Sequence, residues 1–237
     1  MPGPPVTTTD FAEPSNPYYP TGSSIAGWKP NESSVFTLLG AFFGASVVLF
    51  TSTFILVKRI QPTLTRSELL TIMWFVLSGT IHIFFEGYYI SNFSSLGSQQ
   101  TFIAQMWKEY SFSDSRYLTS NGLVFCLETI TVFVWGPGCL LVAALIVSRS
   151  PWRHPLQIVV SLGQLYGDTL YYATSFFDEA VHGISYSRPE AFYFWFYFVF
   201  MNSLWIIIPA ALIFQSSWTA ASAIAAASQR VESKKLR

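Results

Sequence analysis

Five long runs of apolar residues dominate the chain, and short polar segments separate them. A transmembrane helix needs about 20 mostly apolar residues to cross the hydrocarbon core of a bilayer, and each run is long enough to do so. The pattern therefore predicts an all-α integral membrane protein, a five-helix transmembrane bundle. We expect its spans at about 35–57, 69–90, 123–147, 156–177 and 192–214.

The two ends of the chain differ from this apolar centre. Residues 1–30 are rich in Pro, Ser and Thr and contain no secretory signal, so we expect a disordered tail there. Residues 219–237 begin Ala-rich and end charged, which predicts a C-terminal tail in water that either follows or extends the fifth helix. The membrane domain is expected to occupy residues 31–218.

The distribution of Lys and Arg predicts the orientation in the membrane. Nine of the 13 basic residues lie on the same side as the C-terminus, in the first and third connections and the C-terminal tail, and four lie on the opposite side. Since cytoplasmic segments carry the excess of Lys and Arg, the C-terminus should be cytosolic and the N-terminus lumenal. Lys234 and Lys235, near the end, resemble a dilysine endoplasmic-reticulum retrieval signal; the alternative is a basic tail attracted to anionic lipid.

Composition supports a membrane protein and excludes several other classes. Apolar residues make up 51% of the chain and charged residues only 11%, which argues against a disordered chain or a coiled coil. Basic and acidic residues are equal in number, so no basic field is available to bind nucleic acid. The two cysteines, Cys126 and Cys139, fall about 20 Å apart on one predicted helix, which is too far for a disulfide.

Ionisable side chains inside the predicted spans indicate a functional site, because charge within a bilayer is costly. They are His82 and Glu86 on the second span, Glu128 on the third and Asp168 on the fourth, and Asn202 adds an amide on the fifth. Each belongs to a stripe of polar or aromatic residues at helical spacing. Because lipid cannot solvate these stripes, they should meet in an intramembrane polar pocket.

The stripes themselves are Ser78–His82–Glu86, Glu128–Thr131–Trp135, Ser161–Gln164–Asp168 and Asn202–Trp205. An intramembrane amide can simply bond a neighbouring helix, and Gln164 and Asp168 are open to that structural interpretation. The convergence of one His and two Glu is harder to explain by packing alone. Two small-residue pairs, Gly40–Gly44 and Gly163–Gly167, are compatible with either close helix packing or a homodimer.

The polar residues are typical of acid–base chemistry in an apolar cavity. A carboxyl group shielded from water can hold a proton near neutral pH, a second can accept one, and a Trp face can stabilise a cation between the two steps. The same set would also form a pocket for a lipophilic amine. A metal held by His82, Glu86 and Glu128 lacks a second imidazole or a thiolate, and no phosphate-binding motif is present, so we expect no metal and no cofactor.

Several blocks of sequence resemble the emopamil-binding protein family. They are HIxxxEGYY at 82–89, QMWKEYxxxDSRY at 105–117, CLETITVFVWGP at 126–137, GQLYGDTLYY at 163–172 and YFWFYFVFMNSLW at 193–205. The resemblance covers about residues 65–215. It implies a sterol Δ8–Δ7 isomerase of the endoplasmic-reticulum membrane, with five helices and no cofactor, which binds a 3β-hydroxysterol and cationic amphiphilic inhibitors.

The resemblance also implies the site residues. The family's catalytic positions correspond here to His82, Glu86, Glu128, Thr131, Asn202 and Trp205. Tyr117 and Asp114 are further family positions, and we place them with Trp135 as substrate-binding residues. The implied reaction protonates sterol C9, passes through a C8 carbocation and removes a proton from C7. We expect His82 with Glu86 to supply the first proton and Glu128, held by Thr131 and Asn202, to take the second, although these roles can be exchanged.

A non-enzymatic alternative remains open. Proteins of the sigma-2 receptor type share this membrane fold and are interpreted as sterol- or drug-binding proteins. Retention of the whole acid–base set favours the isomerase. The expected partners are therefore a sterol substrate, cationic amphiphilic inhibitors and membrane lipid. We expect no binding to nucleic acid, and a homodimer is possible.

Overall fold

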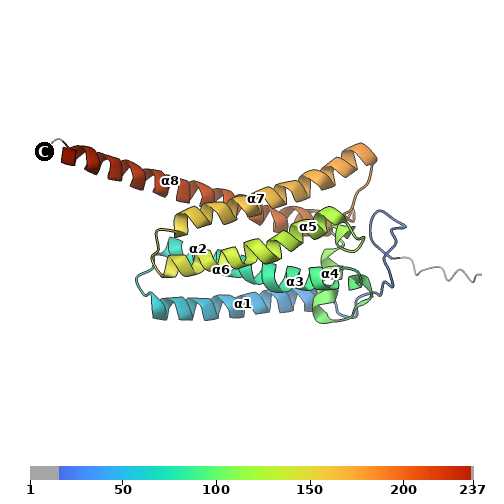
Figure 1. The fold of residues 1–237 in the computed structure, drawn as a ribbon. Helices are drawn as coiled ribbons and strands as arrows, with labels where there is room; N and C mark the ends of the chain where they lie inside the picture. Colours follow the sequence, from blue (N-terminus) through green and yellow to red (C-terminus); the bar gives the residue numbers. More distant parts are fainter. Residues whose placement is uncertain (1–15, 236–237) are drawn as a thin grey trace, which may run out of the picture.

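A computed structural model describes residues 16–235 of the protein, and within this range the chain is helical and contains no strand (Figure 1). The elements are α1 (Val35–Ile60), α2 (Arg66–Thr80), η1 (Ile81–Glu86), α3 (Gly87–Asn92), η2 (Leu96–Ser98), α4 (Phe102–Tyr110), η3 (Ser115–Tyr117), α5 (Gly122–Ile130), η4 (Thr131–Trp135), α6 (Gly136–Val147), α7 (Arg153–Phe177), η5 (Asp178–His182), η6 (Phe192–Met201) and α8 (Asn202–Lys235).

Four continuous helices are long and apolar enough to cross a membrane. They are Val35–Ile60, Arg66–Asn92, Gly122–Val147 and Phe192–Lys235, and they contain four of the five expected spans. The remaining expected span lies in α7, which is 25 residues long but less apolar. Its polar residues Gln157, Gln164 and Asp168 follow one side of the helix, so its average hydropathy is low even though its other side is apolar.

The long helices lie side by side, with α7 against α8 and α2 against α6 (Figure 1). Helix α1 contacts α2 and α4 at the edge of the bundle, and its other faces expose large apolar side chains such as Phe36 and Val48. An apolar outer surface of this kind suits a lipid environment, where there is no water to exclude. The apolar helices and their exposed surface identify a protein suited to a membrane.

The helix starts follow from local sequence. Thr65 caps α2 and forms a capping box with Glu68, in which each side chain bonds the backbone of the other residue. Asn121 caps α5 and Ser34 caps α1 through side-chain oxygens that accept from the first turn. The caps at Thr65 and Asn121 fix where the second and third spans begin. They therefore also fix the position of each cavity residue along those spans.

Four wide π-helical turns occur among residues 16–235. The segments are η1 in the second span, η4 in the third, η5 directly after α7 and η6 before α8. A π turn is rare and frequently marks a functional site. In the third span the π turn η4 ends at Trp135, and α6 follows at once with Pro137 in its first turn.

Residues 16–30, which belong to the tail expected to be disordered, pack against the bundle. Tyr18 and Ile25 are buried with Trp107 and Tyr117 in one aromatic cluster. The Lys108 ammonium donates a 2.9 Å hydrogen bond to the Lys29 carbonyl, which ties this segment to α4. The buried aromatic and apolar side chains of residues 16–30 therefore hold this segment against the bundle. Residues 1–15 of the expected tail lie outside the described residues.

Helix α8 continues well beyond residue 214, where the fifth span was expected to end. It runs to Lys235, and its last part extends past the rest of the bundle (Figure 1). From residue 221 onward its side chains are exposed. The Ala-rich sequence explains the continuity, because Ala has the highest intrinsic helix propensity. Leu236 and Arg237, the last residues of the dilysine-like motif, lie outside the described residues.

Candidate active site

One cavity lies between the long helices and α4, and it collects most of the candidate residues. Helix α1 contributes only apolar side chains, and the polar side chains come from the second span, α4, η3, the third span, α7, η6 and α8. The lining residues are Leu38, Leu39, Phe42, Ile81, His82, Phe85, Glu86, Met106, Trp107, Glu109, Tyr110, Tyr117, Leu127, Glu128, Thr131, Trp135, Gly163, Gln164, Gly167, Asp168, Tyr171, Tyr197, Met201, Asn202 and Trp205.

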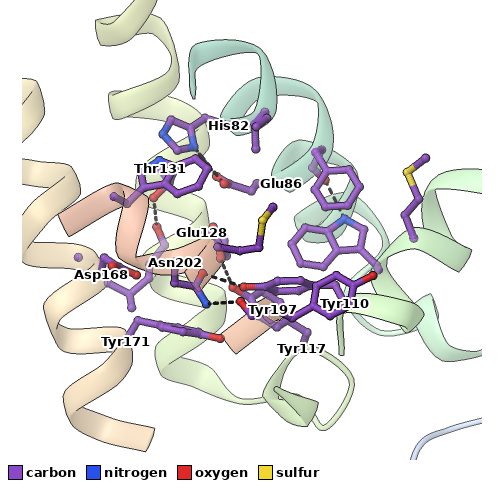
Figure 2. A pocket seen from close by; sticks show the side chains of 18 of the residues that line it. His82, Glu86, Tyr110, Tyr117, Glu128, Thr131, Asp168, Tyr171, Tyr197 and Asn202 are labelled. Atoms are coloured by element: carbon purple, nitrogen blue, oxygen red, sulfur yellow. Dashed lines mark hydrogen bonds and ion pairs between the residues drawn. The ribbon is translucent and has the colours of Figure 1, made fainter. Parts of the chain in front are cut away.

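His82 and Glu86 form a hydrogen-bonded pair at this cavity (Figure 2). His82 Nδ1 lies 3.0 Å from both carboxyl oxygens of Glu86, and both residues are buried. On the other side of the ring, Gln164 Nε2 lies 3.1 Å from His82 Nε2. An amide nitrogen donates, so Nε2 accepts and the imidazole proton sits on Nδ1, facing Glu86. Gln164 therefore fixes the tautomer that points a proton at the carboxyl group.

Glu128 lies opposite Glu86, and the two carboxyl groups are close enough to interact with each other. Its Oε1 atom accepts a 2.7 Å hydrogen bond from the Tyr117 hydroxyl (Figure 2). Two carboxyl groups in one apolar cavity cannot both ionise cheaply, so at least one of them is suited to hold a proton. The arrangement provides a proton donor and a proton acceptor side by side.

Thr131 and Asn202 line the cavity, but they do not hold Glu128 as expected. Thr131 Oγ1 donates to the Leu127 carbonyl, one turn back in its own helix. Asn202 Oδ1 accepts from the Tyr110 hydroxyl at 2.8 Å, and its amide nitrogen donates to the carbonyl of Phe198. The partner of Glu128 is thus Tyr117. Helix-face arithmetic missed it because Tyr117 comes from the loop before α5, not from a neighbouring span.

Two tryptophans complete the cavity wall. The Trp205 ring centroid lies 6.3 Å from that of His82, and its indole nitrogen is buried without a partner. Trp135 fits against Gly163, where a Cβ atom would meet the indole at 2.3 Å. Both aromatic faces can stabilise a cation that forms in the cavity.

Asp114 lies away from the cavity and makes a buried ion pair with Arg116. The Arg116 Nη2 to Asp114 Oδ2 distance is 2.6 Å, and both side chains are almost fully inaccessible. Arg116 also donates to Thr174 and lies over the ring of Tyr171. Asp114 therefore takes part in a structural contact that joins the α4–α5 loop to α7, and it does not line the cavity. The substrate-binding role expected for it stays a prediction.

The structure adds cavity residues that the sequence analysis did not select. They are Glu109, Tyr110, Tyr171 and Tyr197, and Asp168, which was left open between function and helix packing, lines the cavity with them. Three of them come from the aromatic-rich segments between the spans and in η6, where any one of many Tyr residues looked equivalent. Burial raises the pKa of the Glu109 carboxyl and also raises the pKa of the Tyr110 and Tyr117 hydroxyls. These groups therefore stay protonated to a higher pH than they would in water, and they can donate hydrogen bonds into the cavity.

Some buried polar atoms at the cavity have no hydrogen-bond partner among residues 16–235. They belong to Glu109 (Oε1), Gln164 (Oε1), Asp168 (Oδ2), Tyr171 (OH), Tyr197 (OH) and Trp205 (Nε1). Buried polar groups are normally paired, and unpaired ones are costly, so these atoms are suited to meet a ligand. No group of three or more His, Cys, Asp or Glu side chains among residues 16–235 is arranged to hold a metal ion.

Comparison with known proteins identifies the family of this chain. The EBP family, described as EXPERA (EXPanded EBP superfamily), matches residues 102–216. The chain is 38% identical to the 3-beta-hydroxysteroid-Delta(8),Delta(7)-isomerase of Rattus norvegicus, over 86% of this chain and 87% of the relative. It is 37% identical to the enzyme of the same name from Cavia porcellus, over 88% of this chain and 90% of the relative.

A more distant relative has a different name. The chain is 32% identical to the Protoglabretal synthase MOI1 of Citrus sinensis, over 84% of this chain and 90% of the relative. Identity above 30% across nearly whole chains, together with the EXPERA match over the third, fourth and fifth predicted spans, leaves one conclusion. The protein belongs to the EBP family of membrane proteins, within the EXPERA superfamily.

Proposed function

We propose that this protein is a 3β-hydroxysteroid Δ8–Δ7 isomerase. The observation that carries the proposal is the convergence of His82, Glu86 and Glu128 at one largely apolar cavity. Two relatives with this activity in their names match the chain at 37–38% identity over most of its length. An acid, a base and an apolar wall are what the transposition of a ring double bond requires, because no redox step occurs.

The reaction is a proton addition followed by a proton loss. The His82–Glu86 pair delivers a proton to C9 of the C8=C9 bond, which leaves a carbocation at C8. Glu128 then removes a proton from C7, and the electrons of that C–H bond form the C7=C8 double bond. The sterol keeps its composition. The acceptor gains the proton that the donor has lost, and direct interaction between Glu86 and Glu128 offers a route for returning it.

The cavity also favours the intermediate. The C8 cation would lie between two carboxyl groups and the face of Trp205, and each of these lowers the energy of a positive charge. A lipophilic amine that is protonated near neutral pH carries a positive charge that can occupy a similar position. We therefore propose that cationic amphiphiles bind this cavity in competition with sterol, since mimics of a high-energy intermediate can bind orders of magnitude more tightly than substrate.

Heavy water gives the direct test of the reaction. Membranes that contain the protein are incubated with a Δ8-sterol in deuterium oxide, and the product is analysed by mass spectrometry. An isomerase yields a Δ7-sterol that carries deuterium at C9. A binding protein of the sigma-2 receptor type would leave the sterol unchanged, and that result would overturn the proposal.

We further propose that α7 is a fifth span and that the protein resides in the endoplasmic reticulum, with a lumenal N-terminus and a cytosolic C-terminus. Support comes from the position of Gln164 and Asp168 at the same cavity as His82, and from the excess of Lys and Arg on the C-terminal side. An epitope tag after Arg237 should be accessible in selectively permeabilised cells, and a tag before Met1 should be protected. Two tags on one side of the membrane would contradict five spans.

A further inference from the structure

The side of α7 that faces the cavity carries polar groups the proposed proton transfers do not use. Gln164 and Asp168 are four residues apart and share one helix face. Gln164 binds His82 through its amide nitrogen, whereas Asp168 makes no hydrogen bond or ion pair among the described residues. Asp168 was open to a packing role with Ser161 and Gln164. Without a partner on a neighbouring helix, its carboxyl group cannot fulfil that role.

An unpaired carboxyl group in a largely apolar cavity is costly, and the cost disappears when a ligand supplies a hydrogen-bond donor. Three acceptors near the reacting atoms are already engaged: Glu128 accepts from Tyr117, Glu86 faces His82, and Asn202 accepts from Tyr110. Among the described carboxyl groups at this cavity, Asp168 and Glu109 each keep an oxygen without a partner. Asp168 is the one of the two that lies on the helix face of Gln164, which contacts His82.

The position of Asp168 also matches the shape of a hydroxysteroid. It lies one helical turn, a rise of about 6 Å, from Gln164, which contacts the proton-transferring His82. In a 3β-hydroxysteroid the hydroxyl group is on ring A, the ring next to the one that reacts. The opposite cavity wall, from Leu38, Leu39 and Phe42, is apolar and suits the hydrocarbon end of the molecule.

The neighbouring residue Gly167 leaves room for a ring beside Asp168. It lines the cavity, and a Cβ atom built there would meet nothing within 4 Å, so the space is open. Gly163, one turn earlier, is instead covered by Trp135. A flat ring can therefore lie against the backbone of α7 next to the carboxyl group of Asp168.

We infer that Asp168 is the substrate-orienting residue of the cavity, which accepts a hydrogen bond from the 3β-hydroxyl group while ring A lies over Gly167. The inference rests on the proposed isomerase function. It assigns the sterol a direction, with ring A against α7 and the hydrocarbon side chain toward α1. Asp168 is in this sense a specificity-determining residue that takes no part in the proton transfers.

The test pairs a protein change with a substrate change. Purified wild type, Asp168→Ala and Asp168→Asn are assayed with a Δ8-sterol that has the 3β-hydroxyl and with its 3-deoxy counterpart. Asp168→Ala should raise KM for the hydroxysterol by about ten- to a hundredfold, the usual worth of a hydrogen bond to a charged group, and leave kcat and the 3-deoxy substrate nearly unchanged. Asp168→Asn, which keeps an acceptor, should lose less.

Controls separate this role from others. Thr169→Ala changes the next residue on the exposed side of α7 and should behave as wild type. Gly167→Ala should raise KM for both sterols without lowering the melting temperature, because Ala is the better helix former. Equal losses on both substrates in Asp168→Ala and Asp168→Asn, or weaker binding of a hydroxyl-free lipophilic amine to the same degree, would overturn the inference.

A binding assay keeps the inference independent of turnover. Each sterol is competed against a fluorescent lipophilic amine, and affinities replace KM. If wild type isomerises neither sterol, the proposed function fails. The role inferred for Asp168 still holds if wild type binds the hydroxysterol more tightly than the 3-deoxy sterol and Asp168→Ala abolishes that preference. It is wrong if Asp168→Ala keeps the preference.

Discussion

The Tyr117 hydroxyl donates a 2.7 Å hydrogen bond to Oε1 of Glu128, so a loop residue holds the carboxyl group in the third span. Tyr117 is itself enclosed by the rings of Tyr89 and Trp107, which fix the position of its hydroxyl. The α4–α5 loop thereby becomes part of the active-site architecture, although it lies outside the membrane-spanning helices. Its packing determines where the Glu128 carboxyl group points.

Tyr117→Phe should therefore impair catalysis while preserving the fold. The ring keeps its aromatic neighbours, but Glu128 loses its donor, and hydrogen bonds to charged groups contribute about 1.5–3 kcal/mol. We expect kcat for Δ7-sterol formation to fall about ten- to a hundredfold, with little change in melting temperature in detergent. Tyr88→Phe is the matched control, because its hydroxyl bonds Gln99 and Thr101 away from the cavity. Unchanged turnover in Tyr117→Phe would show that Glu128 needs no positioning.

Glu128→Gln should remove the base and keep the shape. Loss of a positioned acid or base typically costs about 10² to 10⁴ in rate. A neutral amide is easier to bury than a carboxylate, so the variant should remain folded. Product formation and melting temperature are measured on the same preparation. Full activity in this variant would contradict the mechanism whatever the family of the protein.

Asp114→Asn should act on stability. Asp114 and Arg116 form an ion pair with almost no exposure, and removal of one charge from such a pair costs about 3–5 kcal/mol because the other remains buried. We expect a much lower melting temperature and a loss of activity only in proportion to unfolded protein. Glu190→Gln breaks the more exposed pair with Arg188 and should cost less than about 1 kcal/mol. Stable but inactive Asp114→Asn protein would restore a binding role for Asp114.

Gly163→Ala should disturb Trp135. The added Cβ would meet the indole at 2.3 Å, so the ring has to move toward the cavity. Overpacking of this kind costs about 1–3 kcal/mol, and sterol affinity should fall with stability. Gly40→Ala on α1 is the control, since nothing lies within 4 Å of its Cβ and the change should be neutral or stabilising. The two variants are compared by thermal melting and by competition with a lipophilic amine.

The buried ammonium group of Lys108 should make the stability of the protein depend on pH. Burial lowers the pKa of its ammonium group to about 8, from 10.5 in the exposed state. Between these values the unfolded chain binds a proton that the folded chain has released, so this contribution to stability rises with pH from about 8. Lys108→Met should flatten the rise in melting temperature between about pH 8 and pH 10. Lys234→Met, at an exposed site, should retain the rise. If the melting temperature of Lys108→Met still rises over this pH range, groups other than Lys108 cause the rise.

The sequence was sufficient to locate the polar positions of the cavity. His82, Glu86 and Glu128 were selected because charge in an apolar span is costly and because helical spacing places side chains on one face. The same reasoning found Trp205, and the structure places all four at one cavity. Their positions could be inferred because they depend only on local periodicity and on the energetics of burial, whereas the roles of these residues stay predictions.

Contacts between segments were beyond that reasoning. Spacing within a helix does not reveal that Tyr117 reaches Glu128, or that Asp114 turns away to meet Arg116 two residues later. The order in residues 16–30 was missed for a related reason. Composition suggested a disordered tail, whereas the burial of Tyr18 depends on a surface formed by α4 and its neighbours. In each case the deciding partner is distant in sequence or lies in an irregular segment.

The wide turns at the cavity have a consequence for how this sequence can change. His82 and Glu86 lie in η1, Thr131 in η4 and Tyr197 in η6, so three of the four described π turns hold cavity residues. A π turn accommodates one residue more than an α-helical turn of the same place. Deletion of one residue from such a turn would therefore allow an ordinary α-helix to form, and the helix beyond the deletion would keep roughly its orientation. The span would still cross a bilayer and pack against its neighbours, but the side chains within the shortened turn would point elsewhere, and the cavity would change without any substitution of a catalytic residue.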